Sequence, residues 1–234
     1  MMKLLLPGLL IACAAPPASP QEPARVHGTV KVNAAIRPKP KAFVLDPACA
    51  AFVEGPLFLE DRQVDKDGGA PGVIVTVKLG LEGRAFEVPK EKVLLQIKGH
   101  RFVPSVFGMR AGQELTIRNE EDHPYCVHAL PFNNKEFNVG LPRRGIEFTK
   151  KFDTVEVPIR IKDDVHPWMG AWVAVLPHPF FAVTDGTGSF EIPGLPPGKY
   201  TIEAWHSLYA PVTKEVEVGE KGEVKADLEF TRRR

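Results

Sequence analysis

The sequence has little net charge, because its 234 residues include 30 Lys and Arg and 29 Asp and Glu. No strong field therefore draws the chain onto nucleic acid or an anionic membrane surface, and nucleic acid is not expected as a partner. The sequence also lacks a phosphate-binding loop, an HExxH motif, paired carboxylates and a Ser/His/Asp string. Nothing in it predicts hydrolytic chemistry, and we expect a protein that is not an enzyme.

Segments with the 3.6-residue period of an amphipathic helix are lacking too. Twenty-three prolines and twenty glycines instead favour short strands joined by turns. Strands are expected at residues 26–32, 72–79, 93–97, 114–119, 126–130, 147–152, 155–161 and 171–176, followed by five short strands up to the C-terminus. The prediction is an all-β protein with two packed β-sandwiches.

Only three cysteines are present, and the first, Cys13, ends the string LIAC, which resembles a bacterial lipobox. The apolar run before it is too short to span a bilayer and has the features of an export signal. We expect Cys13 to be lipidated, the alternative being cleavage near Ala14 or Ala15. Either way the mature protein is expected in the periplasm or cell envelope. A lipid anchor, in the outer membrane if the cell is Gram-negative, is its only expected link to a membrane.

Export leaves two cysteines, Cys49 and Cys126, in an oxidising compartment. One disulfide between them is the simplest expectation there. Sequence separation does not say whether their Cα atoms come within reach of each other. A buried thiol at Cys126 therefore stays open as the alternative.

Two loop segments carry residues suited to a metal site. The string IKDDVHPWMGAW, residues 161–172, places His166 and Met169 three apart between two expected strands. Alternating residues of the first strand share its core face, namely Val155, Val157, Ile159 and Ile161, and Asp163 follows in phase. A carboxylate there is costly unless it is hydrogen-bonded, paired or on a metal. The other segment is NEEDHPYCV, residues 119–127, where Asn119 continues the inner face of the preceding strand.

Together these segments resemble the two copper loops of cupredoxins, which usually read Pro-His-Asn-Val in the first and Cys, two residues, His and then Met in the second. The longer strings HRFVPSVFGMRAGQELTIRN and VHPWMGAWVAVLPHPFFAVTDGTGSFEIPGLPPGKYTIEAWH resemble a narrower group of exported bacterial proteins. In that group a cupredoxin-type sandwich precedes a carboxypeptidase-regulatory-like, or transthyretin-like, module. The resemblance implies a signal and tether at residues 1–25 and a cupredoxin-like Greek-key sandwich with an N-terminal extension at 26–176. A smaller carboxypeptidase-regulatory-like sandwich is implied at 177–234.

The departures from that family fall on the metal ligands. Tyr125 stands where the first copper histidine is expected and Asp163 where the copper cysteine is expected, whereas His166 and Met169 are kept. A blue copper site depends on a short copper–thiolate bond, which Asp163 cannot supply. A non-blue site, for copper or another metal, is therefore expected around His166. Its next candidate ligands are Met169, Asp163, Tyr125 and His128.

Two further alternatives stay open at this stage. A separate site can combine Cys126 and His128, on the opposite strand face from Tyr125, with His100 or His123. The narrower family has a cysteine in place of His100, which implies that Cys49 has lost its usual partner. Alternatively there is no metal: Asp163 accepts backbone N–H bonds in a turn, His166 caps its loop, and Cys126 is buried. The residues His178 and His206 then bond to backbone.

The sequence thus leaves three functions open. The first is an exported metal-binding, or electron-transfer-related, protein with a degenerate, non-blue copper site and a redox partner. The second is a metal-free envelope module that binds protein or glycan through exposed aromatic residues, namely Trp168, Trp172 and Phe180. The third is a subunit of a redox enzyme whose metal site is completed by a partner.

Overall fold

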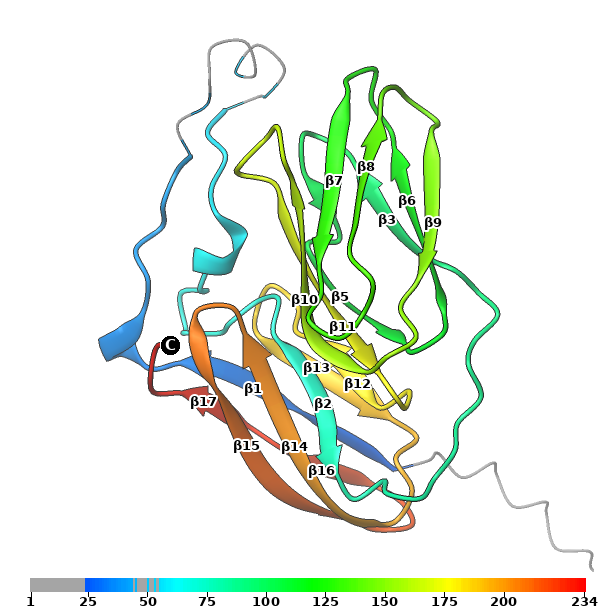
Figure 1. Ribbon diagram of the computed structural model, residues 1–234. Helices are drawn as coiled ribbons and strands as arrows, with labels where there is room; N and C mark the ends of the chain where they lie inside the picture. Colours follow the sequence, from blue (N-terminus) through cyan, green and yellow to red (C-terminus); the bar gives the residue numbers. More distant parts are fainter. Residues whose placement is uncertain (1–23, 44, 46–49, 51–52, 54) are drawn as a thin grey trace, which may run out of the picture.

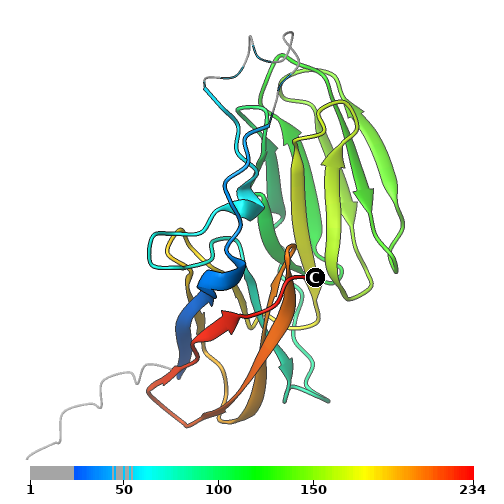
Figure 2. The same cartoon turned by 90° about the vertical axis from the view of Figure 1, so that its left-hand side faces the viewer.

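The computed structural model describes residues 24–43, 45, 50, 53 and 55–234. In this part of the chain there are 17 strands and two short 3-10 helices, η1 (Ala34–Ile36) and η2 (Glu60–Arg62). The strands form two β-sandwiches that lie end to end, with the first in the upper half of Figure 1 and the second below it, as Figure 2 also shows. Among the described residues, no helix is long and apolar enough to cross a membrane.

The first sandwich packs a five-stranded sheet against a four-stranded sheet. The five-stranded sheet has the order β5 (Val106–Arg110), β11 (Gly170–Leu176), β10 (Glu156–Asp163), β7 (Tyr125–Leu130) and β8 (Phe137–Leu141). The four-stranded sheet has the order β4 (Phe102–Val103), β3 (Val93–Ile97), β6 (Glu114–Asn119) and β9 (Glu147–Lys151). After β8 the chain crosses to the other sheet as β9 and returns as β10 beside β7, which is a Greek-key connection.

Residues alternate between core and solvent along these strands, so the inner faces of the two sheets share one core. Leu115 and Ile117 of β6 are fully buried in it, as are Ile159 and Ile161 of β10. Asn119, the next residue in phase on β6, is also fully buried, as the alternation predicted. Each such aliphatic side chain contributes roughly 1.5–3 kcal/mol to the free energy of folding.

The predicted alternation is wrong at the start of β10. Val155 is 45% exposed, whereas Glu156 is buried. The pairing of β10 with β11 shifts between Glu156 and Ile159, and a β-bulge of this kind reverses which residues face the core. The buried Glu156 carboxylate accepts hydrogen bonds from the backbone N–H groups of Phe132 and Asn133, which offset its desolvation.

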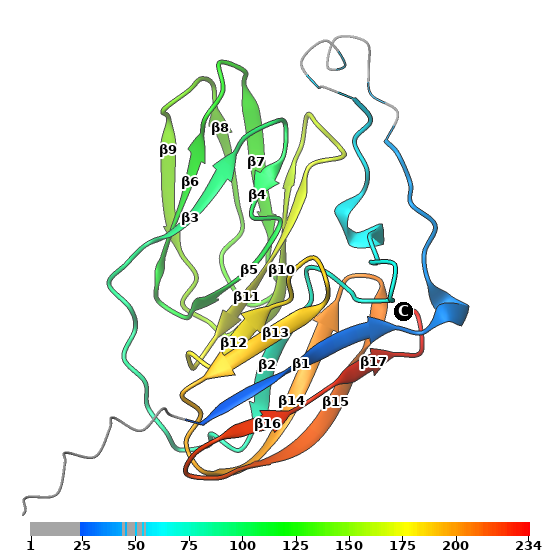
Figure 3. The same cartoon turned by 180° about the vertical axis from the view of Figure 1, so that it is seen from behind.

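The second sandwich also has two sheets, and Figure 3 shows one lying in front of the other. The first has the order β13 (Ser189–Pro193), β1 (Arg25–Val32) and β16 (Glu223–Lys225), and β17 (Leu228–Phe230) also pairs with β1. The second has the order β12 (Phe181–Val183), β2 (Ile74–Leu79), β14 (Gly198–His206) and β15 (Tyr209–Val218). A second hydrophobic core lies between these sheets.

The strands β1 and β2 belong to the second sandwich, although the predicted boundaries placed residues 26–176 in the first unit and 177–234 in the second. Both strands pair only with strands of the second sandwich, and β2 lies between β12 and β14. Val75 and Val77 of β2 face the second core, whereas Ile74 packs with Ala174, Leu176 and Trp205 in a small cluster that joins the two units. The first four residues of β2 are all buried, so both of its faces are covered there, and its sequence does not reveal which sheet it enters.

The predicted fold class is confirmed. The described chain is all-β, with a cupredoxin-like Greek-key sandwich joined to a smaller β-sandwich.

Candidate functional site

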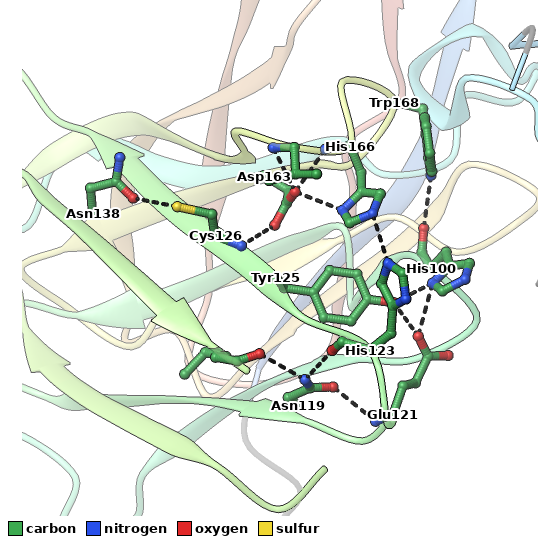
Figure 4. A network of polar contacts seen from close by, with 12 residues as sticks. His100, Asn119, Glu121, His123, Tyr125, Cys126, Asn138, Asp163, His166 and Trp168 are labelled. Carbon is green, nitrogen blue, oxygen red and sulfur yellow. Dashed lines mark hydrogen bonds and ion pairs between the residues drawn. The ribbon is translucent and has the colours of Figure 1, made fainter. Parts of the chain in front are cut away.

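Three loops meet at one end of the first sandwich. The strands β3 and β6 pair in parallel with Ile97 opposite Asn119, so the chain leaves both strands at the same edge. The strand β10 is antiparallel to β7, with Asp163 opposite Val127, so the loop after β10 lies beside the start of β7. Residues 98–101, 120–124 and 164–169 are therefore neighbours although they are far apart in the sequence (Figure 4).

Each of these loops contributes one histidine to a cluster. The ring centroids of His123 and His166 are 5.1 Å apart, as are those of His100 and His123, and those of His100 and His166 are 6.0 Å apart. The Nε2 atoms of His123 and His166 are 3.1 Å apart. His100 and His166 are buried, whereas His123 is half-buried and lies nearest to solvent.

Asp163 organises the loop that carries His166. Its Oδ1 atom accepts hydrogen bonds from the backbone N–H groups of Val165 and His166, at 2.9 and 2.7 Å. The same Oδ1 lies 2.7 Å from His166 Nδ1, while Oδ2 accepts the Cys126 N–H at 2.7 Å. Both oxygens are therefore occupied. Asp163 caps its loop by accepting backbone N–H bonds, as in the turn role that the sequence offered as the alternative to a metal ligand.

A second carboxylate, Glu121, lies beside His100. Its Oε2 accepts a hydrogen bond from the Tyr125 hydroxyl and is 3.0 Å from His100 Nδ1, which also contacts that hydroxyl. Burial alone would raise the pKa of Glu121, but the hydrogen bonds from Tyr125 and the Gly99 N–H outweigh it, and the pKa is lowered. The predicted ligand Tyr125 is thus close to His166, at 5.1 Å between ring centroids, but its hydroxyl is directed to Glu121 and His100.

Asn119 and Trp168 hold the loops in place. The Asn119 side chain donates to the carbonyl oxygens of His123 and Leu141, and its Oδ1 accepts the Glu121 N–H. Trp168 donates its Nε1–H to the His100 carbonyl at 3.1 Å, and its ring lies 5.2 Å from that of His166. Burial, and then the rings of His166 and His100, lower the pKa of His123.

The predicted ligand His128 lies elsewhere, on the outward face of β7. Its Nδ1 is 3.0 Å from Asp164 Oδ2 and its Nε2 is 2.7 Å from Glu136 Oε1, so both ring nitrogens are occupied. The hydrogen bonds to Glu136 and Asp164 raise the pKa of His128. Cys126 lies on the same face, with its Sγ 3.1 Å from Asn138 Oδ1 (Figure 4). Burial, and then Asp164 and Asp163, raise the pKa of that thiol.

The other residues singled out in the sequence are not members of the histidine cluster, or lie outside the described residues. Met169 is buried in the core beneath its loop, where its N–H bonds to the His166 carbonyl. The predicted backbone contacts of His178 and His206 are present, to the Val77 carbonyl and the Leu208 N–H. Cys13 and Cys49 lie outside the described residues. The prediction of a disulfide between Cys49 and Cys126 is therefore untested.

The sequence suggested His100 or His123 as partners of Cys126 and His128, but in the structure both lie beside His166. The signal that places them is the parallel pairing of β3 and β6, which no local pattern encodes. Within the described part of the chain, no set of three or more His, Cys, Asp and Glu side chains is grouped so as to hold a metal ion as it stands.

A cleft of about 450 Å³ lies between this site and the second sandwich. Its walls include Trp168 and Met169 of the histidine loop and Trp172, Trp205 and His206. At its edge the Arg160 guanidinium lies 5.7 Å from the Trp172 ring centroid, a cation–π contact.

The profile of the carboxypeptidase regulatory-like domain family matches residues 159–231. The C-terminal unit is thus similar to a carboxypeptidase-regulatory-like module. The matched residues begin in β10, so they include two strands of the first sandwich and leave out β1 and β2, which complete the module in space. The match covers less than half of the chain and concerns this module alone.

Some solved structures are similar to part of the chain. A purple cupredoxin from Nitrosopumilus maritimus is 21% identical, over 36% of this chain and 99% of that one, with a TM-score of 0.31. The Cu(I) form of the M51A mutant of amicyanin is 17% identical, over 44% and 98%, with a TM-score of 0.32. The copper-containing nitrite reductase from Thermus scotoductus SA-01 is 18% identical, over 57% and 27%, with a TM-score of 0.34.

At TM-scores this low, the similarities support no conclusion about the site. The cupredoxin-like description rests on the strand order and the two loops. None of the curated proteins compared with the chain matches it.

Proposed function

We propose that this protein binds a transition metal in a non-blue site at the loop end of its cupredoxin-like sandwich. The observation that carries the proposal is the pair of His123 and His166, whose Nε2 atoms lie 3.1 Å apart. His166 Nδ1 is 2.7 Å from the Asp163 carboxylate, which accepts a hydrogen bond from the Nδ1–H group, so the lone pair of the neutral ring is on Nε2. Carboxylate-bound histidines of this kind are typical metal ligands.

The donor set does not fit blue copper. Asp163 replaces the thiolate, and its two oxygens accept hydrogen bonds from its own loop and from the Cys126 N–H of β7. Tyr125 replaces the first histidine and bonds to Glu121. The nearby thiol, that of Cys126, lies on the outward strand face beside Asn138. Imidazole donors suit Cu(II) and Zn(II), whereas fast blue-copper electron transfer depends on the thiolate.

The test is metal analysis of the purified protein together with its optical spectrum. We expect a bound transition metal and, with copper, weak absorption only. The variant His166→Ala should lose the metal and keep its β-sheet circular dichroism spectrum, whereas the matched variant His128→Ala should keep both. An intense thiolate-to-copper band, or metal retained in His166→Ala, would contradict the proposal.

We also propose that the protein is exported and is not an enzyme. Export is supported by the N-terminal sequence, in which LIAC resembles a lipobox ending at Cys13. The protein would be anchored in the cell envelope, where its partner is a redox or other envelope protein. Replacing Cys13 by Ser should move the protein from the membrane fraction to the soluble fraction of a cell lysate, whereas Cys126→Ser should not.

A second candidate function, ligand binding without metal, is favoured by the cleft. All three tryptophans of the chain line it, and its wall also carries Asp61, hydrogen-bonded to Ser207. Aromatic faces beside polar side chains suit a glycan. Because all three tryptophans line this cleft, their fluorescence reports on its occupation. A saturable fluorescence change with an oligosaccharide, unaffected by His166→Ala or chelator, would favour this function over metal binding.

A further inference from the structure

We infer that His100, His123 and His166 together form a three-imidazole site for a divalent transition metal. Asp163 and Glu121 would orient the rings and would not bind the ion. The inference rests on the proposed metal-binding function and adds its ligand set. That set differs from the residues that the loop sequences suggested, because His100 and His123 replace Met169, Asp163 and Tyr125.

The spacing of the three rings fits one ion between them. With metal–nitrogen bonds of about 2.0–2.1 Å, two nitrogens in a tetrahedral site lie roughly 3.3 Å apart, and their ring centroids about 5.2 Å apart. The observed centroid distances are 5.1, 5.1 and 6.0 Å, and His123 and His166 approach within 3.1 Å at Nε2. Two of the three distances match the required value, and the distance between His100 and His166 exceeds it, so His100 must move towards His166 before all three nitrogens reach one ion.

The hydrogen bonds of His100 select the correct tautomer. The single proton of the Tyr125 hydroxyl is donated to Glu121. His100 Nδ1, which faces the same hydroxyl and the same carboxylate, must therefore be the donor in its own contact. The lone pair of the neutral ring is then on Nε2, a buried atom on the other side of the ring. Glu121 thus acts on His100 as Asp163 acts on His166.

The backbone at His100 supports a functional role for this residue. It has a φ of +52°, and it is the one residue other than glycine with positive φ in the described part of the chain. This region is unfavourable for a side chain with a Cβ, and such residues are concentrated at functional sites. Glu121 also accepts the Gly99 N–H, at 2.6 Å, so the same carboxylate holds the turn and orients the ring.

The chemistry of the set indicates the class of ion. Three neutral imidazoles without a thiolate suit Cu(II), Zn(II) or Co(II) and do not favour Cu(I). Asp163 and Glu121 add negative charge close to the rings without occupying the coordination sphere, which favours a divalent ion.

The test is calorimetric titration of the metal-free, full-length protein with Zn(II). We expect one ion per chain. His100→Ala and His123→Ala should each lower the affinity by more than the roughly 10- to 100-fold that follows loss of an orienting partner, and Glu121→Gln should fall within that range. His128→Ala and Cys126→Ser serve as controls and should bind as the wild type does.

X-ray absorption of the zinc-loaded wild type makes the test independent of variants that fail to fold. It should show three imidazole ligands at about 2.0 Å, and two or fewer would overturn the inference. If His166→Ala loses the metal but His100→Ala and His123→Ala bind normally, the proposed function stands and this ligand set is wrong. If all three bind normally, both are wrong.

Discussion

Asp163 shows how one residue changes both the chemistry and the construction of a loop. A carboxylate in place of a thiolate removes the soft ligand, and it supplies an acceptor for four N–H groups around it. The sequence predicted that this side chain points inward, and it is indeed buried.

Replacing Asp163 by Ala should therefore destabilise the fold. Four N–H groups lose their acceptor in a buried position, so the free energy of unfolding should fall by roughly 3 kcal/mol. Urea unfolding measures this. The exposed Asp122 provides the control, because its change to Ala should alter the free energy by about 0.5 kcal/mol or less. Equal effects of the two changes would contradict the loop-capping role.

His206 is a buried histidine that should make the stability of the fold depend on pH. Burial, and then the charge of Arg234, lower its pKa from 6.5 to about 4. Between pH 6.5 and pH 4 His206 binds a proton in the unfolded chain but not in the folded chain. The contribution of neutral His206 to the free energy of unfolding is therefore complete above pH 6.5 and is lost as the pH falls towards 4. The loss amounts to roughly 3 kcal/mol.

The measurement is the free energy of unfolding of the wild type and of His206→Asn at pH 7 and at pH 4. The wild type should lose stability on acidification by more than the variant does. An identical loss in the two proteins would show that the pKa of His206 is the same in the folded and unfolded states.

At the scale of elements, alternation predicted the longer strands well. The strands β3 and β6 have the predicted bounds, and β1, β7, β9 and β11 differ from them by a single residue. The strands β4, β5 and β8 were not predicted, because short or glycine-containing segments such as FNVGL show weak alternation. The bulge in β10 was also not predictable, since it depends on the partner strand.

The pairing of β1 with the second sandwich can be tested through Gly28. A Cβ at this position would lie 2.5 Å from the Ala226 carbonyl oxygen, a backbone atom that cannot move aside cheaply. We expect Gly28→Ala to lower the free energy of unfolding by about 1–3 kcal/mol.

Gly186 is the matched control for Gly28, because an added Cβ there meets nothing within 4 Å. Gly186→Ala should leave the unfolding midpoint close to that of the wild type. If the two variants unfold alike, β1 does not pack against the strand that follows Ala226.

At the scale of the whole molecule, the two sandwiches are interleaved in the sequence. The second takes β1 and β2 from before the first, and the cluster of Ile74, Ala174, Leu176 and Trp205 connects their cores. The rings of Trp172 and Trp205, one from each sandwich, contact each other at 5.4 Å between centroids.

A fragment of residues 177–234, the unit that the sequence predicted, should therefore not fold alone. Without β1 and β2 it loses the central partner of one sheet and the neighbour of β14 in the other. Circular dichroism should show no cooperative thermal transition for the fragment and a sigmoidal one for residues 24–234. A cooperative transition in the fragment would restore the predicted boundary.

Local patterns along the sequence were enough to predict the all-β class, the resemblance to two β-modules and the departure of Tyr125 and Asp163 from the copper loops of cupredoxins. These features depend on local alternation, turn residues and residue identity, all of which are visible along the chain. Which strands pair and which histidines meet is known from the tertiary structure. The parallel pairing of β3 with β6 brings His100 and His123 to His166, and the sheet order moves β1 and β2 into the second sandwich. Both outcomes depend on contacts between residues far apart in the sequence, which no local pattern encodes.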